Sequence, residues 1–449
     1  MDTAQTIRPL HAISSRRNWS TEFERARAKL RTVSFDAVFF GLAVCAVPVS
    51  IAVAESFIAV SLAFRIAAVV SGRTKIVLPR VFWFWLAWAA LEITAWRRSP
   101  DVRIGGGEMR HLALIAVLFL LVPSIPRASD RVLVWCGVAW TTTVSSLVLI
   151  GHFIWQLLYY RGSLAPVIYL RGGGLLHHWM VFGTVEIIVL AALLELWHYF
   201  PEKRGWLLPV LVVNAIAIVL SLTRMLWICS FLLVALDLAR RRSRWLWAVP
   251  VIPCVLFLIA PSPVRSRVTE SSHLEYYSNA ERLQMWRVGW RIVREKSWFG
   301  VGPGRVNGIY TTYLSPADPV PAYHGHLHNN LVQLAAEFGL PVAGAAVLFT
   351  AILFRDLRRR CRVALDRDQE FLCRAALLGL TGFVAAGIFD YTYGHSLGLN
   401  LLAFAVLSPL VAEAEAGSGA SQGRPIRADG STASFRTLRP SRPQNRCFL

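Results

Sequence analysis

The chain has 449 residues, of which 55% are hydrophobic and only 16% are charged, and it carries a formal net charge of +20. A soluble protein typically has about 25% charged residues, so the composition excludes an ordinary soluble enzyme. The positive charge does not indicate a nucleic-acid-binding protein either. The basic residues lie between long apolar stretches, where they set membrane topology or contact anionic headgroups.

Apolar stretches suited to crossing a bilayer, which takes about 20 residues per helix, recur along the chain. They predict an all-α polytopic membrane protein with about 12 transmembrane helices. The predicted spans are 35–53, 54–71, 81–97, 110–126, 131–157, 173–198, 205–222, 223–239, 244–262, 329–354, 372–389 and 394–412. Residues 1–34 form a basic cytoplasmic tail without a cleavable signal peptide. Residues 413–449, rich in Gly, Ser, Pro and Arg, are expected to be a disordered cytoplasmic tail.

The distribution of Lys and Arg between the spans predicts the orientation. One set of connecting segments, which includes both tails, carries 31 of these residues, and the opposite set carries 15. The richer set should be cytoplasmic. The segment 97–110 dissents, with four arginines on the poorer side. Residues 263–328 then form one large periplasmic loop, and both termini are cytoplasmic.

This topology places the chemically unusual residues on the outer face. These residues are Arg161, Arg171, Arg224, Arg282, His328 and Asp390. Arg224 heads a helical hairpin between two apolar runs. An arginine near hydrocarbon is costly without an anionic partner, and a guanidinium fork suits phosphate. The alternative is an arginine that snorkels to the headgroups.

Residues 281–298 of the large loop have the pattern of an amphipathic helix. Leu283, Trp286, Trp290 and Val293 recur at helical spacing, and arginines form a second stripe. Such a helix lies in the membrane interface, either as a simple anchor or also to present Arg282 to an anionic headgroup. The glycine-rich segment 300–304 that follows is expected to turn the chain, although glycine clusters also bind phosphate.

Three alternating histidines, His324, His326 and His328, precede the tenth span. Zinc binding is an alternative, but the sequence shows no acidic or cysteine partner nearby, and no metal is predicted. His328 differs from the other two because it begins a helix with a polar start. A neutral imidazole there could take a proton from a hydroxyl, against the alternative of a structural histidine.

Four features in this order resemble the O-antigen ligase family: Ser221-x-x-Arg224, Arg282-x-x-x-Trp286, the Gly-Val-Gly turn at 300–302 and His328-Asn329. Asn329 and Gly339 fit the family pattern after the histidine. Val342 and Ile228 depart mildly from it, which weakens the choice among subfamilies. The resemblance covers roughly residues 35–412, the membrane-embedded glycosyltransferase domain.

The resemblance implies a glycosyltransferase of the Gram-negative inner membrane that acts in the periplasm. It would transfer a polysaccharide from undecaprenyl pyrophosphate to the lipid A–core oligosaccharide, without a cofactor or metal ion. Arg224 and Arg282 would stabilise the pyrophosphate, with Arg161 and Arg171 as further candidates. His328 would be the base and would give inversion at C1. Asn329 and Asp390 would orient groups near the site.

Three alternatives remain open at the level of sequence. An O-antigen polymerase or a protein O-oligosaccharyltransferase of the same superfamily would share the donor chemistry and differ in the acceptor. A transporter of lipid-linked glycans would be expected to show interrupted helices and polar residues at mid-membrane, where Glu92, Glu186 and Glu195 are the main acids. A structural scaffold would leave the outer arginines unexplained.

Overall fold

The computed structural model describes residues 34–419 except 177, 261, 271–276, 317 and 319–324, and within these ranges its regular elements are helices. The two predicted tails therefore lie almost wholly outside the described residues, and so does His324. The first helices are α2 (Phe35–Ala46), α3 (Ile51–Val70), α4 (Val81–Arg97), α5 (Arg110–Leu121), α6 (Ala128–Tyr159), α7 (Leu164–Tyr169), α8 (Trp179–Tyr199), α9 (Arg204–Leu220), α10 (Arg224–Arg240) and α11 (Ala248–Ile259). The later ones are α12 (Ser262–Glu270), α13 (Tyr277–Glu295), α14 (Val306–Ile309), α15 (Asn330–Phe338), α16 (Leu340–Val363), α17 (Arg367–Ala386) and α18 (Ser396–Gly419).

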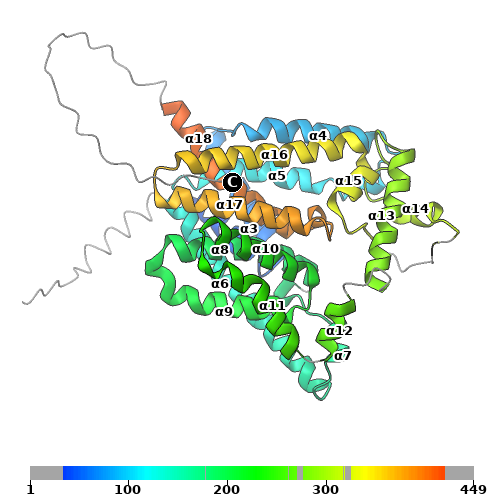
Figure 1. The fold of residues 1–449 in the computed structure, drawn as a ribbon. Coiled ribbons are helices and arrows are strands. Elements are labelled where there is room, and N and C mark those ends of the chain that lie inside the picture. The colour runs from blue at the N-terminus through cyan, green and yellow to red at the C-terminus, as the bar shows by residue number, and fades with distance from the viewer. Residues whose placement is uncertain are drawn as a thin grey trace, which may run out of the picture.

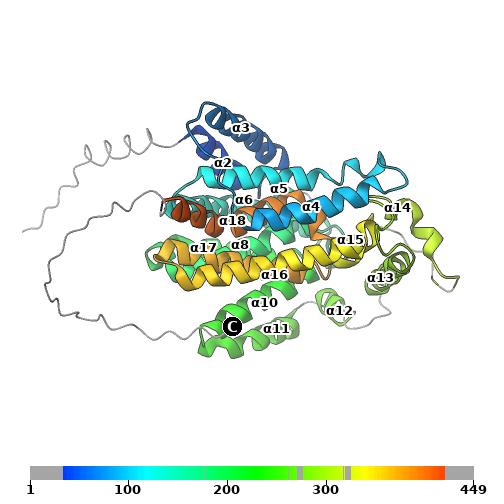
Figure 2. The same cartoon turned by 90° about the horizontal axis from the view of Figure 1, so that it is seen from above.

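The long helices run side by side in a bundle, and α8, α17 and α18 lie at its centre (Figures 1 and 2). Seven helical segments of the described residues are long and apolar enough to cross a membrane, and shorter apolar helices accompany them. The expectation of a polytopic all-helical membrane protein is thus confirmed, while the count of 12 spans stays a prediction. Helices α12 to α15 gather at one end of the bundle, which we call the loop end, opposite the far end (Figure 2).

The structure corrects the predicted tenth span, 329–354. The chain forms two helices there, α15 and α16, separated at Gly339. Gly339 has φ +90°, and a Cβ at this position would lie 2.2 Å from the carbonyl oxygen of Trp298. Only glycine fits such a conformation and such a close approach. The short helix α15 is therefore a separate element at the loop end, and α16 is the helix long and apolar enough to cross a membrane.

The predicted amphipathic helix exists as α13, but its packed face differs from the predicted tryptophan stripe. Met285, Val288 and Ile292 are buried, whereas Trp290 is 52% exposed. α13 packs on α15, and a Cβ on Gly289 would clash with the side chains of Val332 and Leu327. One face of α13 is therefore fixed to the protein, and Trp290 lies on another.

Candidate active site

His328 and Asp390 form a buried pair at the loop end. His328 precedes α15 and Asp390 follows α17, so 62 residues separate them in the chain. Nδ1 of His328 lies 3.1 Å from Oδ1 of Asp390. His328 is 8% exposed and Asp390 is fully buried. The sequence named both residues but predicted neither the contact nor its geometry.

Polar side chains at the start of α15 fix this pair in place. Asn329 caps the helix, because its side-chain oxygen accepts hydrogen bonds from the backbone N–H groups of Leu331 and Val332. Asn330 donates from its side chain to Thr392 Oγ1 at 2.8 Å and from its backbone to the carbonyl of Gly387. The start of α15 is thereby tied to the segment that carries Asp390. Asn329 thus caps α15, and its part in substrate binding stays a prediction.

The backbone of His328 is strained. Its φ of +49° lies in the left-handed region, which is uncommon for residues other than glycine. Strain of this kind costs about 1–3 kcal/mol and persists only where the surroundings enforce it. Hydrogen bonds on both sides of His328 hold its backbone in this conformation. Asn329 and Asn330 donate from their side chains to Ile388 O and Thr392 Oγ1, and the backbone N–H of Leu327 donates to Gln333 Oε1.

Further histidines surround Asp390, and the sequence did not predict that His178 and His395 lie there. His395 Nε2 lies 3.7 Å from Asp390 Oδ2, and its Nδ1 lies 3.2 Å from Thr184 Oγ1. The ring of His326 packs edge-on against that of His328, with the centroids 4.2 Å apart. His178 caps α8 and lies close enough to Asp390 and His328 to feel their charges. A polar residue at the outer end of an apolar span was the available signal for His178 and His395.

The charges of this cluster decide which nitrogen of His328 is basic. Burial alone would raise the pKa of Asp390, but the hydrogen bond from His328 and the nearby His395 lower it to about 2. The carboxylate is therefore ionised and can only accept hydrogen bonds. Nδ1 of His328 must be the donor, which leaves the lone pair of the neutral ring on Nε2. The pair thus presents an oriented base.

Burial and the charge of His328 lower the pKa of His326 to about 4. Burial also lowers the pKa values of His178 and His395, against the attraction of Asp390. These three rings are neutral near pH 7. Asp390 therefore holds a negative charge among uncharged imidazoles.

Three of these residues could also hold a metal ion. One ligand atom from each of His326, His328 and Asp390 lies within 4.8 Å of the others. The expectation that the histidines have no acidic partner nearby is therefore wrong, because folding brings Asp390 to them. Two imidazoles and a carboxylate are a plausible partial ligand set for zinc.

Arg171 lies beside the histidine cluster, and it shares a small cavity with the hairpin that carries Arg224. The guanidinium of Arg171 lies over the ring of Trp179, 4.7 Å from its centroid, and Trp179 stacks on His178. Arg171 also lines a small cavity with Leu220 and Leu222 of the hairpin that ends at Arg224. Arg224 is the first residue of α10, directly after Thr223. The hairpin and the histidine cluster therefore meet at one end of the bundle.

Arg282 and Arg161 occupy different settings. Arg282 lies in the first half of α13, which packs against α15, and it is half-buried. Arg161 is exposed in the turn after α6, with φ +50°. Another arginine of α13, Arg291, holds the loop together through Tyr313 O and Asp318.

The Gly-Val-Gly segment forms a turn that caps α15. The backbone N–H groups of Val301 and Gly302 donate to the carbonyls of Ala336 and Glu337. Gly300 has φ +62°, and a Cβ there would lie 2.3 Å from the carbonyl carbon of Glu337. These amides satisfy helix carbonyls, so the segment turns the chain, as expected, and does not cradle phosphate.

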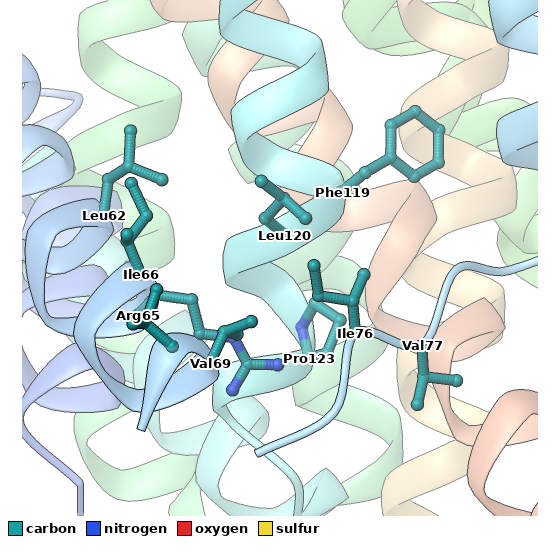
Figure 3. Close-up of a pocket in the computed structure, with 10 residues that line it drawn as sticks. Leu62, Arg65, Ile66, Val69, Ile76, Val77, Phe119, Leu120 and Pro123 are labelled. Atoms are coloured by element: carbon teal, nitrogen blue, oxygen red, sulfur yellow. The ribbon is translucent and has the colours of Figure 1, made fainter. Parts of the chain in front are cut away.

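An apolar cavity of about 220 Å³ lies away from this cluster, between α3 and α5 at the far end (Figure 3). Its one charged lining residue, Arg65, is paired with Asp36 at 3.5 Å. The remaining lining is apolar and includes Leu62, Phe119 and Pro123. Nothing in this cavity offers a nucleophile or base.

Comparison with known proteins supports the resemblance described above. A search of curated proteins found no significant match. Residues 209–349 match the family model described as O-antigen ligase, and this range contains Arg224, Arg282 and His328. Asp390 lies outside it. The central segment of the chain, residues 209–349, is therefore similar to the O-antigen ligase family.

Proposed function

We propose that this protein is an O-antigen ligase that transfers a polysaccharide from undecaprenyl pyrophosphate to the lipid A–core oligosaccharide. The observation that carries the proposal is the His328–Asp390 pair, which presents a base at the start of α15 within the family match. The reaction occurs at the periplasmic leaflet of the Gram-negative inner membrane. It uses no metal ion or nucleotide.

The transfer is a displacement at C1 of the donor sugar. The acceptor hydroxyl oxygen forms a bond to C1 while the bond from C1 to the pyrophosphate oxygen breaks. His328 Nε2 takes the proton of the hydroxyl, and the undecaprenyl pyrophosphate leaves with the electron pair. Attack opposite the leaving group inverts C1. Asp390 supports this step because it holds the ring in orientation and stabilises the imidazolium that forms.

The arginines stabilise the leaving group. Negative charge grows on the pyrophosphate as the C1–O bond breaks, and donors already in place for it lower the barrier. Arg224 and Arg282 are the first candidates, because both lie in the family match. Arg171 is supported by its proximity to the histidine cluster through Trp179 and His178. For Arg161, exposed in its turn, support is weakest.

Reconstituted transfer with three acceptors tests the proposal. Purified protein and lipid-linked glycan are incubated with lipid A–core, with a second lipid-linked glycan or with a pilin-like protein. We expect product only with lipid A–core. Product with the second glycan would identify a polymerase, and product with the protein an O-oligosaccharyltransferase. No product with any acceptor, while glycan is moved across a sealed vesicle, would identify a transporter.

Cysteine labelling in whole cells tests the orientation. An introduced cysteine at Pro316, in the large loop, should react with a reagent that cannot cross the membrane. Protection of this position, with labelling at Arg244 instead, would place the histidine cluster on the cytoplasmic side and contradict the proposal.

A further inference from the structure

Helix α16 presents one continuous face to its surroundings, and the chemistry of that face changes abruptly along its length. The opposite face is buried in the bundle through Val342, Ala346, Leu353 and Leu357. The exposed positions in chain order are Leu340, Gly344, Val347, Leu348, Ala351, Arg355, Arg358, Arg359, Arg362 and Val363. The half toward the loop end is apolar, and the half toward the far end carries four arginines, followed by Val363 at the end of the helix.

The spacing places the four arginines together. Residues three, four and seven apart share one side of an α-helix. Neighbouring like charges at these spacings destabilise a helix. The group of Arg355, Arg358, Arg359 and Arg362, which we call the arginine stripe, therefore carries a cost that a bound anion would remove.

The protein itself offers few carboxylates to the arginine stripe. Arg355 contacts Asp356 through its Nε at 2.8 Å. Within the described part of the chain, no carboxylate lies within ion-pair distance of Arg358, Arg359 or Arg362. Arg360, by contrast, points into the bundle and donates from Nε to the carbonyl of Pro409. The stripe is thus distinct from an arginine that has a structural task.

The stripe borders a groove of about 700 Å³ on the outside of the bundle. Its apolar part is lined by Ala351 and Phe354, and Thr381 of α17 also contributes. On the side of the groove toward the loop end, Val347 and Leu348 are 50% and 60% exposed. A surface that is apolar in one half and cationic in the other matches an acyl chain joined to an anionic headgroup.

The position along α16 sets the level of the stripe in the membrane. At about 1.5 Å per residue, Arg355 stands about 22 Å from Leu340. The hydrocarbon core is about 30 Å thick. If Leu340 lies at the outer limit of the hydrocarbon, the stripe runs from a depth of about 22 Å at Arg355 to about 33 Å at Arg362, so it crosses the inner limit at the far end. Long arginine side chains at this depth reach the phosphates of one leaflet.

We propose that the groove beside the arginine stripe binds a membrane phospholipid whose headgroup carries two phosphates, diphosphatidylglycerol. Four guanidinium groups can grip two phosphates, with a pair of forks on each. The acyl chains lie against Val347, Leu348 and Ala351. This site is separate from the His328 cluster and does not depend on the proposed reaction.

Lipid retention tests the site. The full-length protein is extracted in mild detergent, exchanged into a known mixture of diphosphatidylglycerol, phosphatidylglycerol and phosphatidylcholine, and examined by native mass spectrometry. In the test variant, Arg355, Arg358, Arg359 and Arg362 are replaced by Gln. In the matched control, four exposed basic residues at the same end, Arg73, Lys75, Arg127 and Arg244, are replaced by Gln.

The wild type and the control should retain diphosphatidylglycerol, and the test variant should retain at least about tenfold less, since each basic side chain near a phosphate surface contributes appreciably. Equal loss in the control would mean general attraction to anionic lipid and would overturn the site. Equal retention in the test variant would do the same. Retention of phosphatidylglycerol as strong as that of diphosphatidylglycerol would overturn the two-phosphate assignment. If the quadruple variant fails to fold, the double variant Arg358→Gln/Arg362→Gln is compared with Arg127→Gln/Arg244→Gln.

Discussion

Two buried aspartates of this chain each accept a hydrogen bond from a histidine at 3.1 Å, at opposite ends of the bundle: Asp390 from His328 and Asp237 from His198. Asp237 also receives Arg240 and Arg241, at 2.7 and 2.8 Å, and the same arginines bind the buried Glu195. Around Asp390 the neighbouring side chains that can carry a positive charge are histidines.

The two aspartates differ in whether the groups that neutralise them can lose their protons near neutral pH. Arginine stays protonated at any physiological pH, so the carboxylates of Asp237 and Glu195 are permanently neutralised and the network serves as structure. A histidine partner exchanges its proton near neutral pH. The same donor–acceptor distance therefore marks an ion-pair network at the far end and a candidate acid–base centre at the loop end.

The largest effect is expected from removal of the base. His328→Ala should lower the rate of transfer by about 10²–10⁴-fold, the usual contribution of a positioned base. Wild-type transfer should fall at acidic pH, because a protonated imidazole cannot accept the hydroxyl proton. That acidic decline should vanish from the residual activity of His328→Ala. The rates are measured at saturating donor, and donor binding is measured separately.

A different outcome would reassign the residue. If His328→Ala bound donor poorly but turned over normally at saturation, His328 would be a donor contact. Asp390 would then be the next candidate for the base.

Matched substitutions of the two aspartates test the comparison directly. Asp390→Asn removes the ionised acceptor that orients His328 and should lower transfer by about 10–100-fold, with a small change in melting temperature. Asp237→Asn leaves the half-buried Arg240 and Arg241 with only the buried Glu195 as a shared carboxylate, and should reduce stability by about 1–3 kcal/mol. Its activity per folded molecule should stay close to that of the wild type. If both substitutions affected only stability, the two pairs would be equivalent and the catalytic interpretation of Asp390 would fail.

Substitutions of arginine test the proposed role of the loop end in binding pyrophosphate. Arg224→Lys and Arg282→Lys should each lower transfer by about tenfold, because a lysine keeps the charge but cannot make the paired contact of a guanidinium fork. Arg161→Lys, at an exposed position, is the comparison variant. Initial rates with purified donor are the measurement. Full activity in both lysine variants would count against recognition of the pyrophosphate.

The predicted spans agree best with the structure where charged residues mark both ends of a span. α4 matches its predicted range of 81–97, because Arg80 and Arg97 frame a run that is apolar except for Glu92 and Thr94. The break at Gly339 was missed, although Gly339 followed by Pro341 is the usual sequence signal for the end of one helix and the start of the next.

The sequence predicted which residues belong to the site, but not which of them contact one another. His328 and Asp390 were named from their positions at span ends. Their pairing depends on the bonds of Asn330 to Thr392 and Gly387, which join segments about 60 residues apart and leave no local pattern in the sequence. The same long-range folding brings an acid to the histidines, and the sequence analysis had found none there.

His326 is expected to matter little for transfer and more for acid stability. His326→Ala and His324→Ala should each stay within about tenfold of wild-type transfer. The pKa of His326 is lowered to about 4, below the ordinary value of about 6.5 in an unfolded chain. Its contribution to stability is therefore complete above about pH 6.5 and is lost as the pH falls toward 4. The melting temperature of His326→Ala should fall less over this range than that of the wild type. An unchanged slope would show that another group, such as His178 or His395, controls the acid sensitivity.

The smallest expected effect is that of a chelator. His326, His328 and Asp390 lie close enough together to hold a metal ion, so the question is open to experiment. A metal on His328 would occupy the lone pair that the proposed mechanism uses for the proton, and one on Asp390 would compete with the bond that orients the ring. A base and a metal ligand are thus exclusive roles for this imidazole. Transfer by purified protein should therefore be unchanged in EDTA. His326→Ala, which removes one ligand, should respond in the same way as the wild type. Loss of activity in EDTA that zinc or magnesium restores, together with loss in His326→Ala, would establish a metal centre in place of the base. The comparison with Asp237 would then be one between an ion-pair network and a metal site.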